Sequence, residues 1–130
     1  MTSRTNVYGG EMKNKILVID DEIGPRESLR ILFKDNYEVT VANNGEEGIQ
    51  VIKKDPPDLV ILDLKMPGMD GIEVLQKIKA INPKAKVIIL TGYGSPEMTQ
   101  QAQRLGAILC LNKPFDIFEI RQLVSEKING

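Results

Sequence analysis

Short apolar runs in this sequence are followed closely by residues that could carry chemistry. These residues are Asp20, Asp21, Asp63, Thr91 and Lys113. Carboxylates held close together repel one another and raise one another's pKa values, so a cluster of them makes physical sense around a cation. Ligation by carboxylate oxygens, with water completing the shell, suits Mg2+. The first prediction is therefore a magnesium site.

The same residues could also accept a phosphoryl group. The cation and the ammonium of Lys113 would form a positive pocket, and the Thr91 hydroxyl could donate a hydrogen bond to a phosphate oxygen. Asp63 would be the nucleophile, forming an acyl phosphate by in-line attack. The proline and glycines that follow, in residues 66–71, let the chain leave the strand sharply without covering Asp63.

Repeated strand-helix units are needed to bring these residues together. Apolar runs alternate with segments of helical period, which predicts the α/β class: a doubly wound, five-stranded parallel sheet with helices on both faces. We take the strand order to be the flavodoxin-like 2-1-3-4-5. In that order the carboxyl ends of the strands form the ligand crevice, and all the candidate residues lie there. The predicted strands are 16–19, 38–41, 59–62, 87–90 and 108–111, and the predicted helices are 25–34, 46–53, 71–80, 96–105 and 117–128.

Composition narrows the class of function. The chain has 130 residues, which predicts one domain. Its single cysteine excludes a disulfide within the chain. Because it has no histidine, it cannot use a histidine-activated nucleophile or carry phosphohistidine. A net charge of -1 without a basic stripe predicts no direct nucleic-acid partner. The apolar runs are too short to span a membrane and no signal pattern is present, so we expect a cytoplasmic protein.

The chain divides into a short arm and one domain. Residues 1–12 are mostly polar, contain glycine and show no periodicity, which predicts a disordered N-terminal arm. The domain covers residues 13–130. Its last helix should bury Ile117, Ile120, Val124 and Ile128, which recur at helical spacing.

The motifs at the strand ends resemble those of the receiver domains of bacterial two-component response regulators. They stand in the order of that family and cover the chain from about residue 13 to its end. Each motif alone is weak, but together they are highly specific. They are the pair Asp20-Asp21, the run Asp63-Leu-Lys-Met-Pro-Gly-Met-Asp-Gly, the pair Thr91-Gly92, and Lys113-Pro114-Phe115.

The resemblance implies a phosphorylated switch or relay module rather than a turnover enzyme, one that catalyses only its own phosphorylation and dephosphorylation. Asp63 would accept a phosphoryl group from a phosphohistidine on a sensor histidine kinase or a histidine phosphotransferase. Mg2+ would be held by Asp21 directly, by Asp20 partly through water, by Asp63, and by the backbone carbonyl of Lys65. A cis peptide bond between Lys113 and Pro114 is also implied. The downstream effector or output domain is not indicated.

Within the family, two subclasses are similar to this chain. Lys65, Tyr93 and the run from Lys113 through Arg121 resemble the single-domain receiver of the sporulation phosphorelay. The segment 90–95 also resembles receivers of the nitrogen-regulator class. One position departs from the pattern, because Cys110 stands where many receivers carry an aromatic ring that moves on phosphorylation, and a thiol cannot replace that movement.

Other interpretations of the same residues remain open. The acidic pair could cap a helix, Lys113 could be a solvated loop residue, and Thr91 could hydrogen-bond to the backbone. A haloacid-dehalogenase-like phosphohydrolase uses a similar set but has a second aspartate where this chain has Lys65. A receiver that only docks partners is a further alternative. A flavin mononucleotide site is rejected, because the acidic segment 20–22 would repel the phosphate.

Overall fold

A five-stranded parallel sheet forms the centre of the molecule. The computed structural model describes residues 4–5, 11–64, 70–92 and 96–129, with side chains from residue 13 onward. The strand order is β4-β3-β5-β6-β7, and all four pairings are parallel. In chain order this is 2-1-3-4-5, so the predicted topology is confirmed. The strands are β3 (Lys15–Ile19), β4 (Glu38–Ala42), β5 (Leu59–Leu62), β6 (Val87–Thr91) and β7 (Leu109–Asn112).

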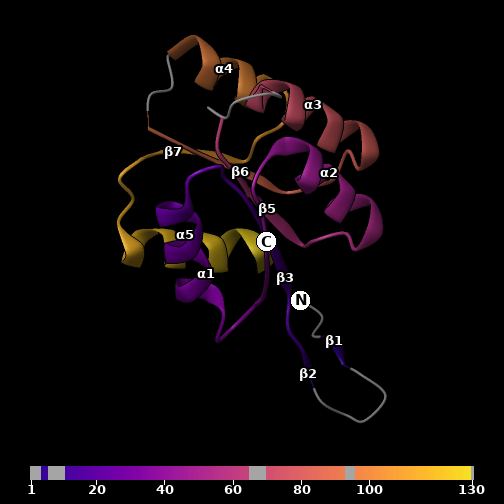
Figure 1. Ribbon diagram of the computed structural model, residues 1–130, viewed down its shortest axis with the longest axis vertical. Coiled ribbons are helices and arrows are strands. Elements are labelled where there is room, and N and C mark those ends of the chain that lie inside the picture. Colours follow the sequence, from indigo (N-terminus) through magenta and orange to yellow (C-terminus); the bar gives the residue numbers. More distant parts are fainter. Residues whose placement is uncertain (1–3, 6–10, 65–69, 93–95, 130) are drawn as a thin grey trace.

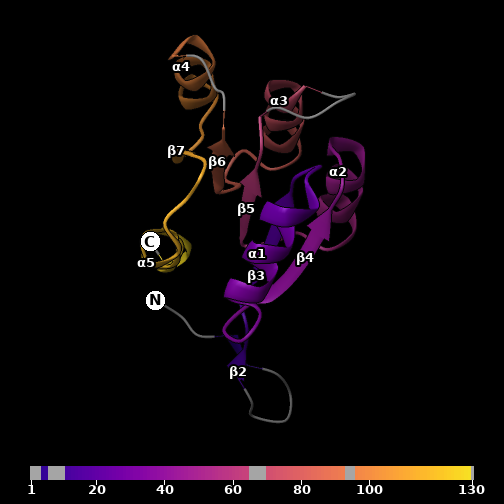
Figure 2. The same ribbon diagram turned by 60° about the vertical axis from the view of Figure 1, so that its left-hand side comes forward.

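Helices cover both faces of this sheet, as Figures 1 and 2 show. Leu29 of the first helix and Ile120 of the last share one apolar cluster with one set of sheet side chains. Ile49, Leu75 and Ala102, from the three helices between them, belong to a second cluster on the other face. The helices are α1 (Ile23–Phe33), α2 (Gly45–Lys54), α3 (Gly71–Ile81), α4 (Pro96–Arg104) and α5 (Ile117–Asn129). The predicted doubly wound α/β class is therefore confirmed.

The central strands are apolar throughout because both of their faces are covered. All four residues of β5 are buried, as are all five of β6. A strand that packs against helices on both sides cannot alternate apolar with polar residues, so it appears in sequence as a continuous Val, Ile and Leu run. This pattern is why the strand positions could be predicted closely.

One predicted core residue is exposed. Ile120, Val124 and Ile128 of α5 are buried as expected, but Ile117 is 49% exposed. Ile117 is the first residue of its helix, and a helical side chain leans toward the N-terminal end of its own helix. That direction takes Ile117 off the end of the helix rather than onto the sheet, so its inclusion in the core was wrong.

The N-terminal segment contains a small strand pair. β1 (Arg4–Thr5) and β2 (Glu11–Met12) pair antiparallel, so the prediction of a disordered arm does not hold for these four residues. Backbone pairing over two residues needs no side-chain pattern, which is why the sequence did not indicate it. The ladder lies apart from the five-stranded sheet (Figure 1). The other residues of the predicted arm lie outside the described residues.

Within the described ranges, no helix is both long enough and apolar enough to cross a membrane.

Candidate functional site

Backbone hydrogen bonds continue just beyond the ends of the strands, and they hold three of the candidate residues in place. The Asp20 amide donates to the Ala42 carbonyl at 3.2 Å, and the Asp63 amide donates to the Ile19 carbonyl at 3.0 Å. The Lys113 amide donates to the carbonyl of Thr91 at 2.9 Å. Because parallel strands end at one edge of the sheet, these three links bring residues far apart in sequence into one site.

The side chain of Lys113 lies between two buried carboxylates. Its Nζ is 2.8 Å from Oδ2 of Asp20 and 3.2 Å from Oδ2 of Asp63, whose residues are only 2% and 4% exposed. Burial alone would lower the pKa of Lys113, but the hydrogen bonds and charges of Asp20 and Asp63 outweigh it and raise that pKa above its ordinary value. Lys113 is therefore positively charged at neutral pH.

Four carboxylates gather beside this lysine. Asp20, Asp21, Glu22 and Asp63 each offer an oxygen atom, and these atoms all lie within 4.8 Å of one another. Glu22 is the third carboxylate near the lysine, with its Oε1 3.6 Å from Nζ. When all four carboxylates are ionised, the single positive charge of the Lys113 ammonium does not balance their negative charge. The excess of negative charge, held partly away from water, is suited to binding a metal ion.

Asp20 is held by three contacts that use different atoms. One carboxylate oxygen accepts from the backbone amide of Glu22 at 2.9 Å, and the other accepts from Lys113. The carbonyl of Asp20 accepts from Nη1 of Arg26 at 3.1 Å. The N-cap residue of α1 is Glu22, without a side-chain capping bond, so Asp20 is a turn residue rather than the helix cap. Sequence reasoning missed Arg26, because no motif signals an arginine that bonds to a backbone carbonyl six residues earlier.

Thr91 has a buried hydroxyl for which the described part of the chain offers no hydrogen-bond partner. The residue is 2% exposed, and its Oγ1 has no hydrogen-bond partner among the described residues. A buried polar group without a partner is costly, and a functional role is one explanation for it. The structural alternative, in which this hydroxyl bonds to the backbone, is not what the described residues show.

The site opens into a pocket of about 500 Å3. The pocket lies beside the start of α1 and the loop between β7 and α5, where the peptide bond between Lys113 and Pro114 is cis, as the family resemblance implied. Lys65 and Tyr93 lie outside the described residues. The pocket is lined by Glu22, Pro25, Ser28, Asp63, Gly92, Lys113, Pro114 and Phe115.

Cys110 is the residue that the family resemblance sets at the position of a moving aromatic ring. It belongs to β7, is half-buried and packs against the apolar cluster on the α2 to α4 face. Burial raises the pKa of its thiol. The residue therefore resembles a small core side chain more than a reactive nucleophile.

We expect Cys110 to react slowly with iodoacetamide. Because the thiolate is the reacting form, a raised pKa and partial burial both slow alkylation in the folded protein at a pH of about 8. Intact mass followed over time should show several-fold slower labelling in buffer than in urea. Equal rates under the two conditions would show that the thiol is neither protected nor protonated by the fold.

Comparison with known proteins places this chain in one family. The chain belongs to the response regulator receiver domain family, whose match covers residues 16–125. Sporulation initiation phosphotransferase F of Bacillus subtilis (strain 168) is 46% identical over 116 residues, which cover 88% of this chain and 94% of that protein. The protein is thus a receiver domain of the kind found in two-component and phosphorelay signalling.

Longer regulators and a solved structure show the same relationship. The transcriptional regulatory protein ZraR of Escherichia coli (strain K12) is 40% identical over 113 residues, which cover 86% of this chain and 25% of ZraR. The chain therefore spans about a quarter of the length of that regulator. The crystal structure of a CheY-like response regulator receiver domain protein from Methanospirillum hungatei JF-1 has a TM-score of 0.87 at 30% identity, covering 90% of this chain and 94% of that chain.

Proposed function

We propose that this receiver accepts a phosphoryl group on Asp63, with Lys113 and Thr91 assisting. The observation that carries the proposal is the contact of 3.2 Å between the buried Asp63 carboxylate and the Lys113 ammonium, inside a pocket that opens to solvent. A carboxylate used only for stability would not need an open pocket. The Thr91 hydroxyl supplies a second donor that is not used within the described chain.

The transfer forms one bond and breaks another. An oxygen of Asp63 attacks phosphorus in line, and the bond from phosphorus to the donor's imidazole nitrogen breaks with its electron pair staying on that nitrogen. The imidazole leaves in its neutral form because the other ring nitrogen already carries a proton. Lys113 then faces a phosphoryl oxygen in place of a free carboxylate, and Thr91 donates to another oxygen. Both contacts offset the negative charge that arrives with the phosphoryl group.

A phosphohistidine donor would lie outside these 130 residues, because they contain no histidine. A phosphohistidine on a sensor histidine kinase or a histidine phosphotransferase fits this requirement. The similarity to a protein named as a phosphotransferase supports a relay role. We place the protein in the cytoplasm, where such donors act and where its single cysteine stays reduced. Its downstream partner would not be nucleic acid, since the net charge is only -1.

Mg2+ fits the carboxylate group by the chemistry of its donors. All four offered ligand atoms are carboxylate oxygens, which Mg2+ prefers, and Asp21 is exposed and so reachable by a hydrated ion. We propose Asp20, Asp21 and Asp63 as ligands, together with the carbonyl of Lys65, which lies outside the described residues. A bound Mg2+ would neutralise charge on the phosphoryl oxygens.

Incubation with acetyl phosphate tests the proposal. Intact mass should show a single phosphoryl adduct in the presence of Mg2+ and none in EDTA. Continuous release of inorganic phosphate at many turnovers, without a lasting adduct, would favour a phosphohydrolase. Neither adduct nor release would leave a module that only docks its partners and would contradict phosphorylation of Asp63.

Replacing Asp21 by alanine should weaken Mg2+ binding without unfolding the protein. Removing one of a few charged ligands is expected to raise the dissociation constant by about tenfold or more, because affinity follows the number of charged ligands. A rise in melting temperature on Mg2+ titration reports the binding. Asp35→Ala, which removes an exposed carboxylate elsewhere, is the control and should respond like wild type. An unchanged response of Asp21→Ala would remove this residue from the ligand set.

A further inference from the structure

All four polar atoms of Asp20 have hydrogen-bond partners, and one partner is a side chain that lies outside the pocket. The Asp20 amide donates to the Ala42 carbonyl at 3.2 Å, and its carboxylate oxygens accept from the Glu22 amide and from Lys113. The backbone carbonyl of Asp20 accepts from Nη1 of Arg26 at 3.1 Å. Lys113 lines the pocket, whereas Arg26 does not. The bond from Arg26 can therefore be removed without changing the pocket itself.

The Asp20 carbonyl depends on Arg26 because the sheet does not supply another donor. Asp20 comes directly after the last residue of β3, and the neighbouring strand β4 ends at Ala42. Asp20 is only 2% exposed, so water does not readily replace a protein donor. A buried carbonyl without a donor is costly. Arg26 is half-buried near the start of α1 and reaches back six residues to this carbonyl.

Fixing this carbonyl also fixes the peptide bond between Asp20 and Asp21. A peptide unit is planar, so the direction of the Asp20 carbonyl sets the direction of the Asp21 amide. It thereby also limits where the Asp21 side chain leaves the backbone. Asp20 and Asp21 each offer a carboxylate oxygen to the group of four acidic side chains. Rotation of this one peptide unit would move the two carboxylates relative to each other and to Asp63.

The positive charge of Arg26 does not by itself explain its place. A guanidinium repels a metal ion, so an arginine acting through charge alone would weaken Mg2+ binding. An arginine that served to neutralise the acidic group would be expected to contact one of the carboxylates. In the described part of the chain, the guanidinium of Arg26 makes this one hydrogen bond and no ion pair. Positioning and charge therefore predict opposite effects when Arg26 is removed.

We propose that Arg26 is a positioning residue for the metal site. Through the Asp20 carbonyl, it holds the peptide unit between Asp20 and Asp21 in the orientation that presents both carboxylates to Mg2+. This inference rests on the proposed function, because it takes Asp20 and Asp21 as Mg2+ ligands for the phosphorylation of Asp63. Arg26 acts through Asp20 and has no contact with the phosphoryl group.

Calorimetric titration of Mg2+ into the full chain tests this role. Arg26→Met keeps the aliphatic stem and suits a helix, but it removes both the donor and the charge. It should raise the Mg2+ dissociation constant by about fivefold or more, equal to about 1 kcal/mol, although a repelling charge has been removed. Arg26→Lys keeps a donor and the charge and should recover most of this loss. Arg26→Ala should behave like Arg26→Met, which guards against an effect peculiar to methionine.

Arg30→Met is the matched control. It removes the same charge one turn later in α1, where the Arg30 guanidinium pairs with Glu27 at 2.9 Å and makes no bond to Asp20. It should bind Mg2+ like wild type. Urea denaturation in EDTA should show one cooperative transition for every variant, so that a change in Mg2+ affinity is not a loss of fold.

Phosphorylation by acetyl phosphate provides the second readout. The Mg2+ concentration that gives half of the maximal rate of adduct formation should rise for Arg26→Met by the same factor as the dissociation constant. If wild type binds Mg2+ and forms the adduct but Arg26→Met binds equally well or more tightly, the positioning role is overturned and the proposed function stands. An equal loss in Arg30→Met would also overturn it. Wild type with neither Mg2+ binding nor adduct would overturn both proposals.

Discussion

Replacing Asp63 by asparagine is expected to abolish the phosphoryl adduct. An amide cannot form the acyl phosphate, so we expect adduct formation to slow by at least about a thousandfold, which corresponds to about 4 kcal/mol in the barrier. The fold should survive, because the substitution removes one of several crowded like charges while Lys113 keeps its 2.8 Å contact with Asp20. Intact mass after incubation with acetyl phosphate and Mg2+ measures the loss.

Asp70→Asn is the matched control for this loss. Asp70 is exposed, and its Oδ1 accepts a hydrogen bond from the Ile72 amide at 2.9 Å as the N-cap of α3. Asparagine caps helices about as well as aspartate, so this variant removes a nearby carboxylate while keeping the local structure. It should be phosphorylated like wild type. An adduct on Asp63→Asn at the wild-type rate would mean that another residue is the acceptor.

The second large effect is expected for Gly71→Ala. A Cβ at this position would lie 2.3 Å from Cα and 2.5 Å from the carbonyl oxygen of Leu64, both backbone atoms. The amide of Gly71 also donates to that carbonyl at 3.1 Å, so the start of α3 is fixed against the chain just past Asp63. Because backbone cannot rotate away, we expect a loss of about 3 kcal/mol in the free energy of unfolding. The melting temperature should fall by about 10 °C.

Gly48→Ala is the matched comparison for Gly71→Ala, because its new Cβ would meet a side chain rather than the backbone. A Cβ there would lie 2.4 Å from Cδ1 of Ile19, which is the end of a flexible side chain. Ile19 can change its rotamer, and alanine inside a helix is favoured over glycine by about 1 kcal/mol. We therefore expect a loss below about 1 kcal/mol. Urea denaturation of both variants measures the difference, and equal losses would show that the backbone contact at Leu64 does not limit the packing of α3.

A displaced Leu64 should also disturb the site, since it adjoins Asp63. Mg2+ should stabilise Gly71→Ala less than wild type when the melting temperature is followed during titration. The new Cβ of Gly48→Ala would meet only side-chain atoms of Ile19, so the Ile19 carbonyl that accepts from the Asp63 amide should stay in place and Gly48→Ala should keep the full Mg2+ response.

The fold class could be predicted from the amino-acid sequence, and the strand order followed from taking the flavodoxin-like arrangement. Short, continuous apolar runs between helical segments are typical of parallel strands in a sheet covered on both faces. Once the order was known, the ends of β3, β5, β6 and β7 had to share one edge. That is why Asp20, Asp63, Thr91 and Lys113 could be placed together before any coordinates, although their chemical roles remain predictions.

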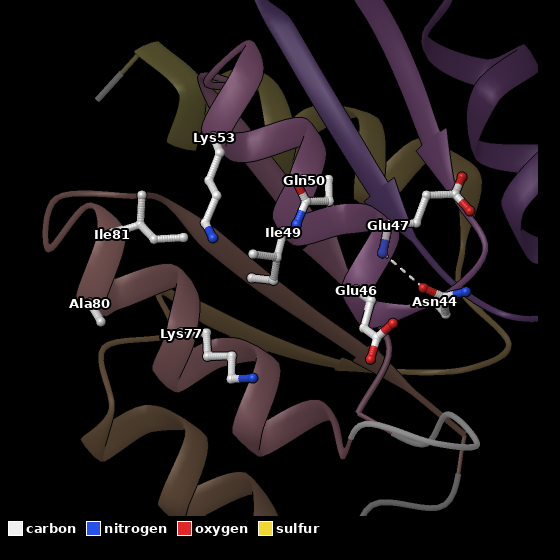
Figure 3. Close-up of a pocket in the computed structure, with 9 residues that line it drawn as sticks. All are labelled: Asn44, Glu46, Glu47, Ile49, Gln50, Lys53, Lys77, Ala80 and Ile81. Atoms are coloured by element: carbon white, nitrogen blue, oxygen red, sulfur yellow. Dashed lines mark hydrogen bonds between the residues drawn. The ribbon is translucent and has the colours of Figure 1, made fainter.

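The contacts of individual side chains became visible only in the folded molecule. It showed that Ile117 is exposed, that Arg26 holds the Asp20 carbonyl, and that the Thr91 hydroxyl lacks a partner among the described residues. It also showed an open groove between α2 and α3 that is lined by acidic, basic and apolar side chains (Figure 3). These features depend on distances between atoms that lie far apart in the chain, whereas periodicity and motifs report only local conformation and the order of elements.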